Sequence, residues 1–346
     1  MRTIDLNKLI RPHLQGIVPY SSARDDFQGE GQIFLDANEN PCNTGFNRYP
    51  DPHQRKIKKR LAEIKGVSSK NIFLGNGSDE GIDLLMRGFC EPGQDNIIIL
   101  PPTYGMYKVS ARINNIRVIQ VPLDERFNLD VPKISQAITP QTKLIFLCSP
   151  NNPTGNNLSR AKINKLLEMF DGLLIVDEAY IDFSNELSLT TWLKDYSNLV
   201  VLQTLSKAWG LASVRVGLCL AHENIINLLD KIKPPYNISG PNQQQALQAL
   251  AHPEQVLEIV RAIKSQRQYL VDELSKLNII KKVYPSDANF LLVKTVNAHA
   301  LYGYLAKHGI VVRNRTHEPG CEDCLRITVG TDTENQSLIE KLKQYE

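Results

Sequence analysis

The apolar run Lys143-Leu144-Ile145-Phe146-Leu147-Cys148, followed directly by Ser149-Pro150-Asn151-Asn152-Pro153-Thr154-Gly155, decides the fold of this chain. A short run rich in Ile and Leu that ends in Pro, Asn and Gly predicts a buried strand. Similar runs occur at residues 96–100, 117–121, 173–176 and 199–203, and amphipathic stretches such as 78–89 and 159–170 separate them. This alternation predicts an α/β fold with a mostly parallel central sheet that helices cover on both faces.

The pattern changes after Pro234-Pro235, which predicts a domain boundary. A helical segment at 241–277, interrupted near His252-Pro253, precedes strand candidates at 290–293, 310–312 and 325–329. Helices followed by strands are typical of an α+β unit. We therefore expect an N-terminal arm over residues 1–35 that packs on the small domain, a large domain over 36–235 and a small domain over 236–346.

Composition excludes several classes of protein. The 346 residues are 42% hydrophobic, enough for a core divided between about two domains. Forty Lys and Arg against 37 Asp and Glu give a net charge of +3 without a basic stripe, which argues against a nucleic-acid partner. No apolar run reaches the ~18–20 residues that cross a bilayer, and residues 1–14 lack a signal-peptide core, so we expect a cytoplasmic protein.

Cys321 and Cys324 form a C-x-x-C pair that could be a redox pair or half of a zinc site. A structural zinc site needs four ligands, and no second C-x-x-C supplies the others. We therefore expect no metal and interpret these cysteines as reduced, packed thiols.

Polar side chains follow three of the predicted strands. Asn152 follows the strand at 143–148, Asp177 follows 173–176, and Lys207 follows 199–203. Because ligands of parallel sheets bind beyond the carboxyl ends of the strands, an amide, a carboxylate and an amine are expected in one crevice. An amine beside a carboxylate suits a pyridine cofactor held as a Schiff base, with the carboxylate keeping the ring nitrogen protonated.

A phosphate site is also predicted. Gly75-Asn76-Gly77-Ser78-Asp79-Glu80 opens a helix, and a helix N-terminus with free backbone N–H groups binds phosphate. Ser206 and Arg215 add a hydroxyl and a fixed positive charge.

With these motifs the chain resembles the fold-type I pyridoxal-phosphate aminotransferases over nearly its whole length, and among them the histidinol-phosphate aminotransferases. The motifs that carry the resemblance occur in the family's order along the chain. They are Asn47-Arg48-Tyr49-Pro50, the Gly75 to Glu80 turn, Pro101-Pro102-Thr103-Tyr104, Asn152-Pro153-Thr154-Gly155, Val176-Asp177-Glu178-Ala179-Tyr180, Ser206-Lys207-Ala208 and Leu325-Arg326-Ile327-Thr328-Val329-Gly330.

The resemblance implies a role for each matching residue. Lys207 binds pyridoxal 5′-phosphate covalently and moves the substrate proton, and Asp177 pairs with the ring nitrogen. The remaining cofactor contacts are Asn152 and Tyr180 at the phenolic oxygen, Tyr104 on the ring, and Ser78, Asp79, Ser206 and Arg215 around the phosphate. Tyr49 reaches the phosphate bound by the neighbouring subunit, which implies a homodimer.

Substrate choice is expected to depend on cations of the small domain. Arg326 lies on a predicted strand, as the family's anion-binding arginine does, and Arg313 offers a second guanidinium for a phosphate dianion. Val18-Pro19-Tyr20-Ser21-Ser22-Ala23-Arg24 resembles a substrate-covering arm, and its Tyr20 is expected to contact the substrate phosphate. Asn152 is expected to bind the substrate as well as the cofactor. The implied reaction moves an amino group from L-glutamate to imidazole acetol phosphate, giving L-histidinol phosphate and 2-oxoglutarate in histidine biosynthesis.

Two other activities with the same cofactor are compatible with these residues. An aromatic amino-acid aminotransferase would use Arg326 for a carboxylate, and a threonine-phosphate decarboxylase would share a phosphate-binding pocket. A pyridoxal-phosphate sensor joined to a DNA-binding module is disfavoured, because the chain has no additional helix-turn-helix segment.

Overall fold

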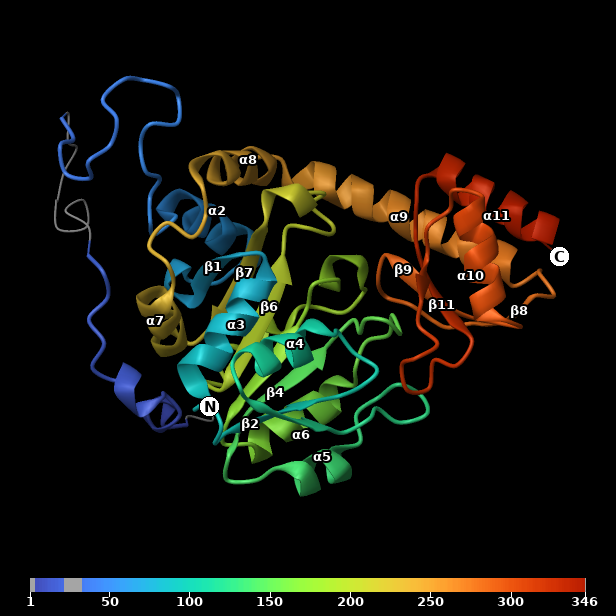
Figure 1. Ribbon diagram of the computed structural model, residues 1–346, viewed down its shortest axis with the longest axis horizontal. Helices are drawn as coiled ribbons and strands as arrows, with labels where there is room; N and C mark the ends of the chain where they lie inside the picture. The colour runs from blue at the N-terminus through green and yellow to red at the C-terminus, as the bar shows by residue number, and fades with distance from the viewer. Residues whose placement is uncertain (1–3, 22–32, 346) are drawn as a thin grey trace.

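A seven-stranded sheet forms the centre of the large domain in the computed structural model, which describes residues 4–21 and 33–345 (Figure 1). Each strand pairs in parallel with its neighbours except β7, which runs antiparallel to both β1 and β6. The mostly parallel sheet predicted from the sequence is therefore confirmed. The strands, in spatial order, are β1 (Ile72–Asn76), β7 (Val216–Ala221), β6 (Leu199–Thr204), β5 (Leu173–Asp177), β4 (Thr142–Cys148), β2 (Asn96–Ile99) and β3 (Arg117–Gln120).

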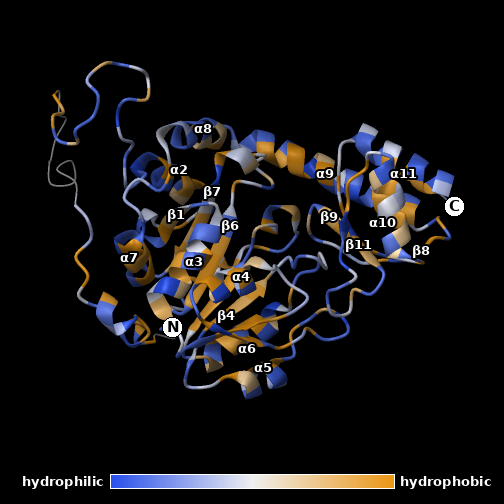
Figure 2. Ribbon diagram, in the orientation of Figure 1, coloured by the Kyte–Doolittle hydropathy of each residue, from blue (hydrophilic) through white to orange (hydrophobic). Residues whose placement is uncertain are grey.

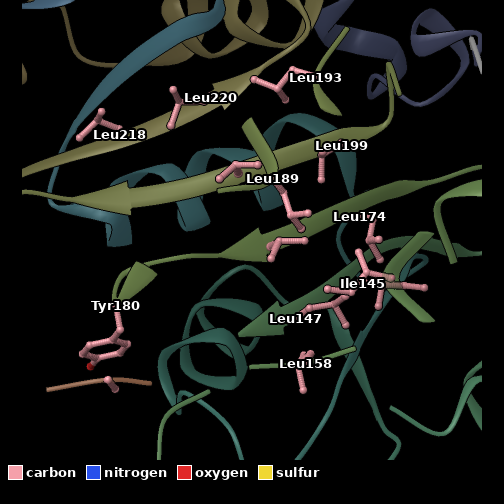
Figure 3. Packing of buried hydrophobic residues seen from close by; sticks show 14 of the residues in the cluster. Ile145, Leu147, Leu158, Leu174, Tyr180, Leu189, Leu193, Leu199, Leu218 and Leu220 are labelled. Carbon is pink, nitrogen blue, oxygen red and sulfur yellow. The ribbon is translucent and has the colours of Figure 1, made fainter. Parts of the chain in front are cut away.

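Both faces of this sheet are buried, which explains why its strands are apolar throughout. Along β4, Ile145 and Leu147 enter the core on one face while Leu144 and Phe146 enter the core on the other. Figure 2 shows the apolar character of the strands, and Figure 3 shows part of one of the two clusters, with Ile145 and Leu147 among its packed side chains. One face is covered by α3 (Ser78–Phe89), α4 (Met106–Ile113) and α7 (Glu223–Ile232), and the opposite face by α2 (Arg55–Lys65), α5 (Val131–Ala137), α6 (Arg160–Met169) and α8 (Gly240–Leu250).

The small domain contains a four-stranded antiparallel sheet backed by helices. Its strands, in spatial order, are β10 (Arg313–Asn314), β11 (Cys324–Thr328), β9 (Phe290–Thr295) and β8 (Ile280–Val283), with α10 (Ala298–Lys307) and α11 (Asp332–Tyr345) packed beside them. The strand expected at 310–312 is displaced, because pairing with β11 begins only at Arg313.

The change from one domain to the other takes place inside α9 (Pro253–Leu274), not at residue 235. Ala246 and Leu250 of α8 and Val260 of α9 pack in the core of the large domain, whereas Leu270 and Leu274 pack in the small one. Figure 1 shows α9 running from one domain to the other. Pro234-Pro235 only separates two helices that cover the same sheet, so the predicted boundary at 235/236 comes too early.

The described part of the N-terminal segment contacts the large domain and not the small one, on which it was expected to pack. Leu6 is buried in the core beneath α3 and α7, and the backbone N–H of Ile4 donates to Ser197 Oγ at 3.0 Å. Arg11 forms an ion pair with Glu91 at 3.2 Å. Ser22, Ala23 and Arg24, which belong to the predicted arm, lie outside the described residues.

The structure describes the C-x-x-C pair and also bears on metal-binding clusters and membrane-spanning helices. Cys321 and Cys324 are free thiols buried around Phe127 and Leu292, and burial raises the pKa of Cys324 to about 11. Within residues 4–21 and 33–345, no three His, Cys, Asp or Glu side chains gather as a metal site would require. Over the same residues, none of the helices combines the length and apolar character needed to cross a membrane.

A glycine where β7 meets the start of α3 provides a test of this architecture. A Cβ on Gly217 would lie 2.1 Å from the backbone nitrogen of Ser78. We expect Gly217→Ala to lower the free energy of unfolding by about 1–3 kcal/mol, the usual cost of overpacking, as measured by denaturant unfolding.

Gly303 of α10 is the matched control, because a Cβ there meets nothing within 4 Å. Gly303→Ala should raise stability by about 0.5–1 kcal/mol through helix propensity. Equal effects of the two substitutions would contradict the close approach at Gly217.

Candidate active site

One cavity lies beyond the carboxyl ends of β4, β5 and β6. Asn152, Asp177 and Lys207 all line it, because these strands are neighbours with Cys148 paired to Asp177 in register. The cavity brings together every site residue predicted from the sequence except Tyr20, Tyr49, Arg313 and Arg326. Its lining consists of Gly77, Ser78, Asp79, Tyr104, Cys148, Asn152, Asp177, Ala179, Tyr180, Thr204, Ser206, Lys207 and Arg215.

Asp177 is a buried carboxylate at the base of this cavity. Its Oδ2 accepts a hydrogen bond from the Tyr107 hydroxyl at 2.8 Å, and its Oδ1 accepts one from the backbone N–H of Ala179 at 3.1 Å. Burial raises the pKa of Asp177 to about 6, although both hydrogen bonds oppose that rise. Among the described residues, Asp177 belongs to no salt bridge within 4.0 Å. A cationic group in the cavity would therefore stabilise it.

Lys207 supplies the amine. Burial and the nearby charges of Arg326 and Arg215 lower its pKa, which makes the neutral, nucleophilic amine more available. Its Nζ lies 5.7 Å from the centre of the Tyr180 ring.

The N-terminus of α3 and Arg215 form an anion-binding corner. Gly77 precedes α3 with a φ of 77°, and a Cβ there would lie 2.4 Å from Nη2 of Arg215, so only glycine fits. Arg215 itself adopts a left-handed φ of 56°, and its Nη2 lies 3.6 Å from Oδ2 of Asp79. Backbone N–H groups at a helix start, with Ser78 and a guanidinium beside them, suit a phosphate.

Arg326 of the small domain joins the cavity through Asn152. Its Nη1 donates to Asn152 Oδ1 at 2.6 Å, and Asn152 Nδ2 donates to the Tyr180 hydroxyl at 3.5 Å. The Arg326 guanidinium lies over the ring of Phe290, 5.2 Å from its centre. Arg326 therefore belongs to the site, although it does not line the cavity itself.

Arg326 is part of an arginine cluster with Arg313 and Arg315. Arg313 lies opposite Arg326 across the β10–β11 pair. Arg315 follows the end of β10 directly, its backbone N–H donates to the carbonyl oxygen of Cys324 on β11 at 2.9 Å, and its charge acts on Arg326. Burial and the other two arginines lower the pKa of Arg326. Nε of both Arg315 and Arg326 is buried and has no hydrogen-bond partner among residues 4–21 and 33–345. The cluster is thus suited to an anion with several oxygen atoms.

The structure does not bring Tyr49 or Tyr20 to the cavity of its own chain. Tyr49 stacks on Tyr236 with 4.5 Å between ring centres. Tyr20 lines a separate hollow on the large domain with Pro52 and Tyr236. Both roles came from the resemblance alone, and the role of Tyr49 requires a second subunit.

Sequence reasoning missed several residues of the site. Tyr107 bonds to Asp177, Arg315 belongs to the arginine cluster, and Cys148 and Thr204 line the cavity. Spacing could have indicated the first two, because Tyr107 lies three residues after Tyr104 and Arg315 two residues after Arg313, the repeats of a helix and of a strand.

The donors in the cavity fit the pyridoxal phosphate expected from the sequence. Among the residues that the structure describes, the buried Asp177 carboxylate forms no salt bridge within 4.0 Å, so it would hold a protonated ring nitrogen, and the α3 corner would hold the phosphate. The amine of Lys207 is the group that would bind the aldehyde.

Comparisons with a family model, with protein sequences and with solved structures all find aminotransferases. The family model described as aminotransferase class I and II matches residues 34–342. A protein from Christiangramia forsetii named histidinol-phosphate aminotransferase is 51% identical, covering 100% of this chain and 99% of its own. The crystal structure of the histidinol-phosphate aminotransferase from Clostridium acetobutylicum has a TM-score of 0.80 at 26% identity, over 87% of this chain and 91% of that one. The Sinorhizobium meliloti enzyme in complex with pyridoxal-5′-phosphate has a TM-score of 0.78 at 25% identity, over 86% and 84%.

The raised pKa of Asp177 predicts a pH-dependent stability of the cofactor-free protein. An unfolded Asp loses its proton near pH 3.8, whereas folded Asp177 keeps its proton up to about pH 6. Stability is therefore retained below pH 3.8 and falls as the pH rises to about 6, by about 3 kcal/mol for Asp177 alone.

Asp177→Asn removes this titration. Denaturant unfolding of the cofactor-free proteins between pH 4 and pH 8 should show a smaller fall for the variant than for the wild type. Identical pH profiles would contradict a strongly raised pKa at Asp177.

Proposed function

Because the chain belongs to the class I and II aminotransferases, whose cofactor is pyridoxal phosphate, we propose that it catalyses the transfer of an amino group from L-glutamate to imidazole acetol phosphate. The products would be L-histidinol phosphate and 2-oxoglutarate, in histidine biosynthesis. Relatives near 50% identity over almost the full length, named histidinol-phosphate aminotransferase, support this assignment. The cytoplasmic location stays a prediction from the sequence.

The arginine cluster is the observation that carries the choice of substrate. A single carboxylate occupies one guanidinium fork, whereas a phosphate dianion presents more acceptor oxygens and a second charge. Arg313 pairs with Arg326 across the small sheet, the charge of Arg315 also acts on Arg326, and Arg326 donates a hydrogen bond to Asn152 in the cavity. A substrate with its amino group at Lys207 and a phosphate at this cluster would neutralise the repulsion among the arginines.

The residues of the cavity divide the work of the reaction. Pyridoxal phosphate, when bound, supplies a ring that withdraws electrons from the carbon that carries the amino group. Asp177 would hold a proton at the ring nitrogen, Asn152 and Tyr180 would contact the phenolic oxygen, and Tyr104 would lie on the ring. Ser78, Asp79, Ser206 and Arg215 would surround the phosphate.

Lys207 would act twice. Its amine first holds the cofactor and, after the substrate displaces it, accepts and returns the substrate proton as a general base and acid. The lowered pKa of Lys207 suits this role, since a neutral amine is needed to accept a proton.

A homodimer is part of this proposal. Ile33, Leu35 and Phe46 are 80%, 91% and 77% exposed, on one segment that also carries Tyr49. Exposed apolar side chains concentrated on one segment indicate a protein interface. A second copy of the chain would cover this segment and receive Tyr49 at its cofactor phosphate, and Tyr20 would approach the substrate phosphate.

The substrate assignment can be tested by half-reactions of the holoenzyme. Stopped-flow absorption would follow the cofactor band after mixing with histidinol phosphate, phenylalanine or threonine phosphate. We expect kcat/KM for histidinol phosphate to exceed that for phenylalanine by at least about a hundredfold, because phenylalanine has no phosphate group to bind the arginine cluster. Faster conversion of phenylalanine would indicate an aromatic aminotransferase, and carbon dioxide release from threonine phosphate would indicate a decarboxylase.

Arg313→Gln is the matched variant for this test. It should raise KM for histidinol phosphate more than KM for glutamate, which has no phosphate. Equal changes for the two donors would remove the arginine cluster as the basis of the choice.

The proposed role of Tyr49 across the dimer predicts complementation. Tyr49→Phe and Lys207→Ala subunits, each impaired alone, should regain activity when mixed and exchanged. Random pairing gives one intact site in half of the dimers, so about a quarter of wild-type activity is the upper limit. Subunit exchange demonstrated by mass-tagged chains, with no recovery of activity, would refute the role in trans.

A further inference from the structure

Tyr107 is a fully buried tyrosine whose ring is held in place from two sides. It lies in the first turns of α4, stacked on Phe146 of β4 with 4.9 Å between ring centres and edge-on to Tyr104 at 5.5 Å. Because the ring is packed in this way, the position of its hydroxyl is defined by the fold.

The hydroxyl is directed at Asp177. It donates to Oδ2 at 2.8 Å, while the backbone N–H of Ala179 donates to Oδ1 at 3.1 Å. Each carboxylate oxygen therefore has its own donor, one from α4 and one from the turn after β5. Two donors from different elements fix the orientation of a carboxylate in a way that one donor cannot.

We infer that Tyr107 is a positioning residue for Asp177: its hydroxyl fixes the carboxylate and keeps it ionised, ready to pair with the cofactor's ring nitrogen. Tyr107 makes this contribution through Asp177, since it is not among the residues that line the cavity. The inference concerns the cofactor site and does not depend on which amino donor the enzyme uses.

The other groups around Asp177 cannot replace this hydrogen bond. Lys207 favours the ionised carboxylate only through its charge, while the negative charge of Asp79 opposes ionisation. Cys148 on β4 stays a neutral thiol, because burial raises its pKa. The hydroxyl of Tyr104 donates to Asp79, and the hydroxyl of Tyr180 accepts from Asn152, so neither is bonded to Asp177.

Tyr107→Phe removes the hydroxyl and leaves the packed ring, so it isolates the hydrogen bond. Loss of a hydrogen bond to the charged carboxylate should raise the pKa of Asp177 by about one unit. The stability of the cofactor-free variant should therefore keep falling for about one pH unit beyond pH 6, where the fall ends in the wild type. The Kd for pyridoxal phosphate, measured by fluorescence quenching, should rise about tenfold.

Two controls separate positioning from packing. Tyr196→Phe is the first control. Its lost hydroxyl does not line the cavity and donates to Asn164 Oδ1 at 2.7 Å, so the pH at which stability stops falling and the Kd for pyridoxal phosphate should stay unchanged. In an Asp177→Asn background, Tyr107→Phe should no longer change the pH profile. If Tyr107→Phe does not fold alone, the double variant should fold, because the unsupported carboxylate is gone.

Some outcomes would overturn the inference. One is an equal loss of stability for Tyr107→Phe at every pH from 4 to 8, with an unchanged Kd. Another is a double variant that fails to fold, which would make Tyr107 a packing residue only.

Discussion

The parallel register of β4, β5 and β6 places an amide, a carboxylate and an amine at one edge of the sheet. Strand pairing aligns Cys148 with Asp177, and β6 lies directly beside β5, so the chain after each strand opens into the same cavity. The strands are buried on both faces, which leaves their carboxyl ends as the places where polar side chains can gather. The proposed cofactor contacts, the proposed proton transfer by Lys207 and the hydrogen bond from Tyr107 all depend on this register.

The proposed substrate-binding cluster is connected to this edge through a hydrogen bond to Asn152. Asn152 accepts from Arg326 at 2.6 Å with its amide oxygen and donates to Tyr180 with its amide nitrogen. The small domain therefore contacts the cavity of the large one through the same residue that is proposed to bind the cofactor. A shift of the small sheet would change both the arginine cluster and the position of Asn152.

Sequence reasoning predicted the elements whose signal is local. The strands at 143–148 and 173–176 and the helix at 78–89 were predicted closely, because continuous apolar runs and one-sided apolar faces depend only on nearby residues. The domain boundary and the contact of the N-terminal segment were not, since both depend on which distant surface a helix or loop covers. The roles of Arg315 and Tyr107 were not predicted for a related reason: each depends on a partner that is distant in sequence and that the fold brings close.

Helix α9 has a consequence for how the protein unfolds. Its 22 residues extend about 33 Å, with Val260 in one core, Leu270 in the other and Ile263 packed against both. Loss of either core would expose part of this helix and weaken its remaining half, so the two domains are thermodynamically coupled. A chain cut between residues 235 and 236 would yield two fragments with exposed apolar surface, because Ala246, Leu250 and Val260 on the second fragment pack in the core of the first.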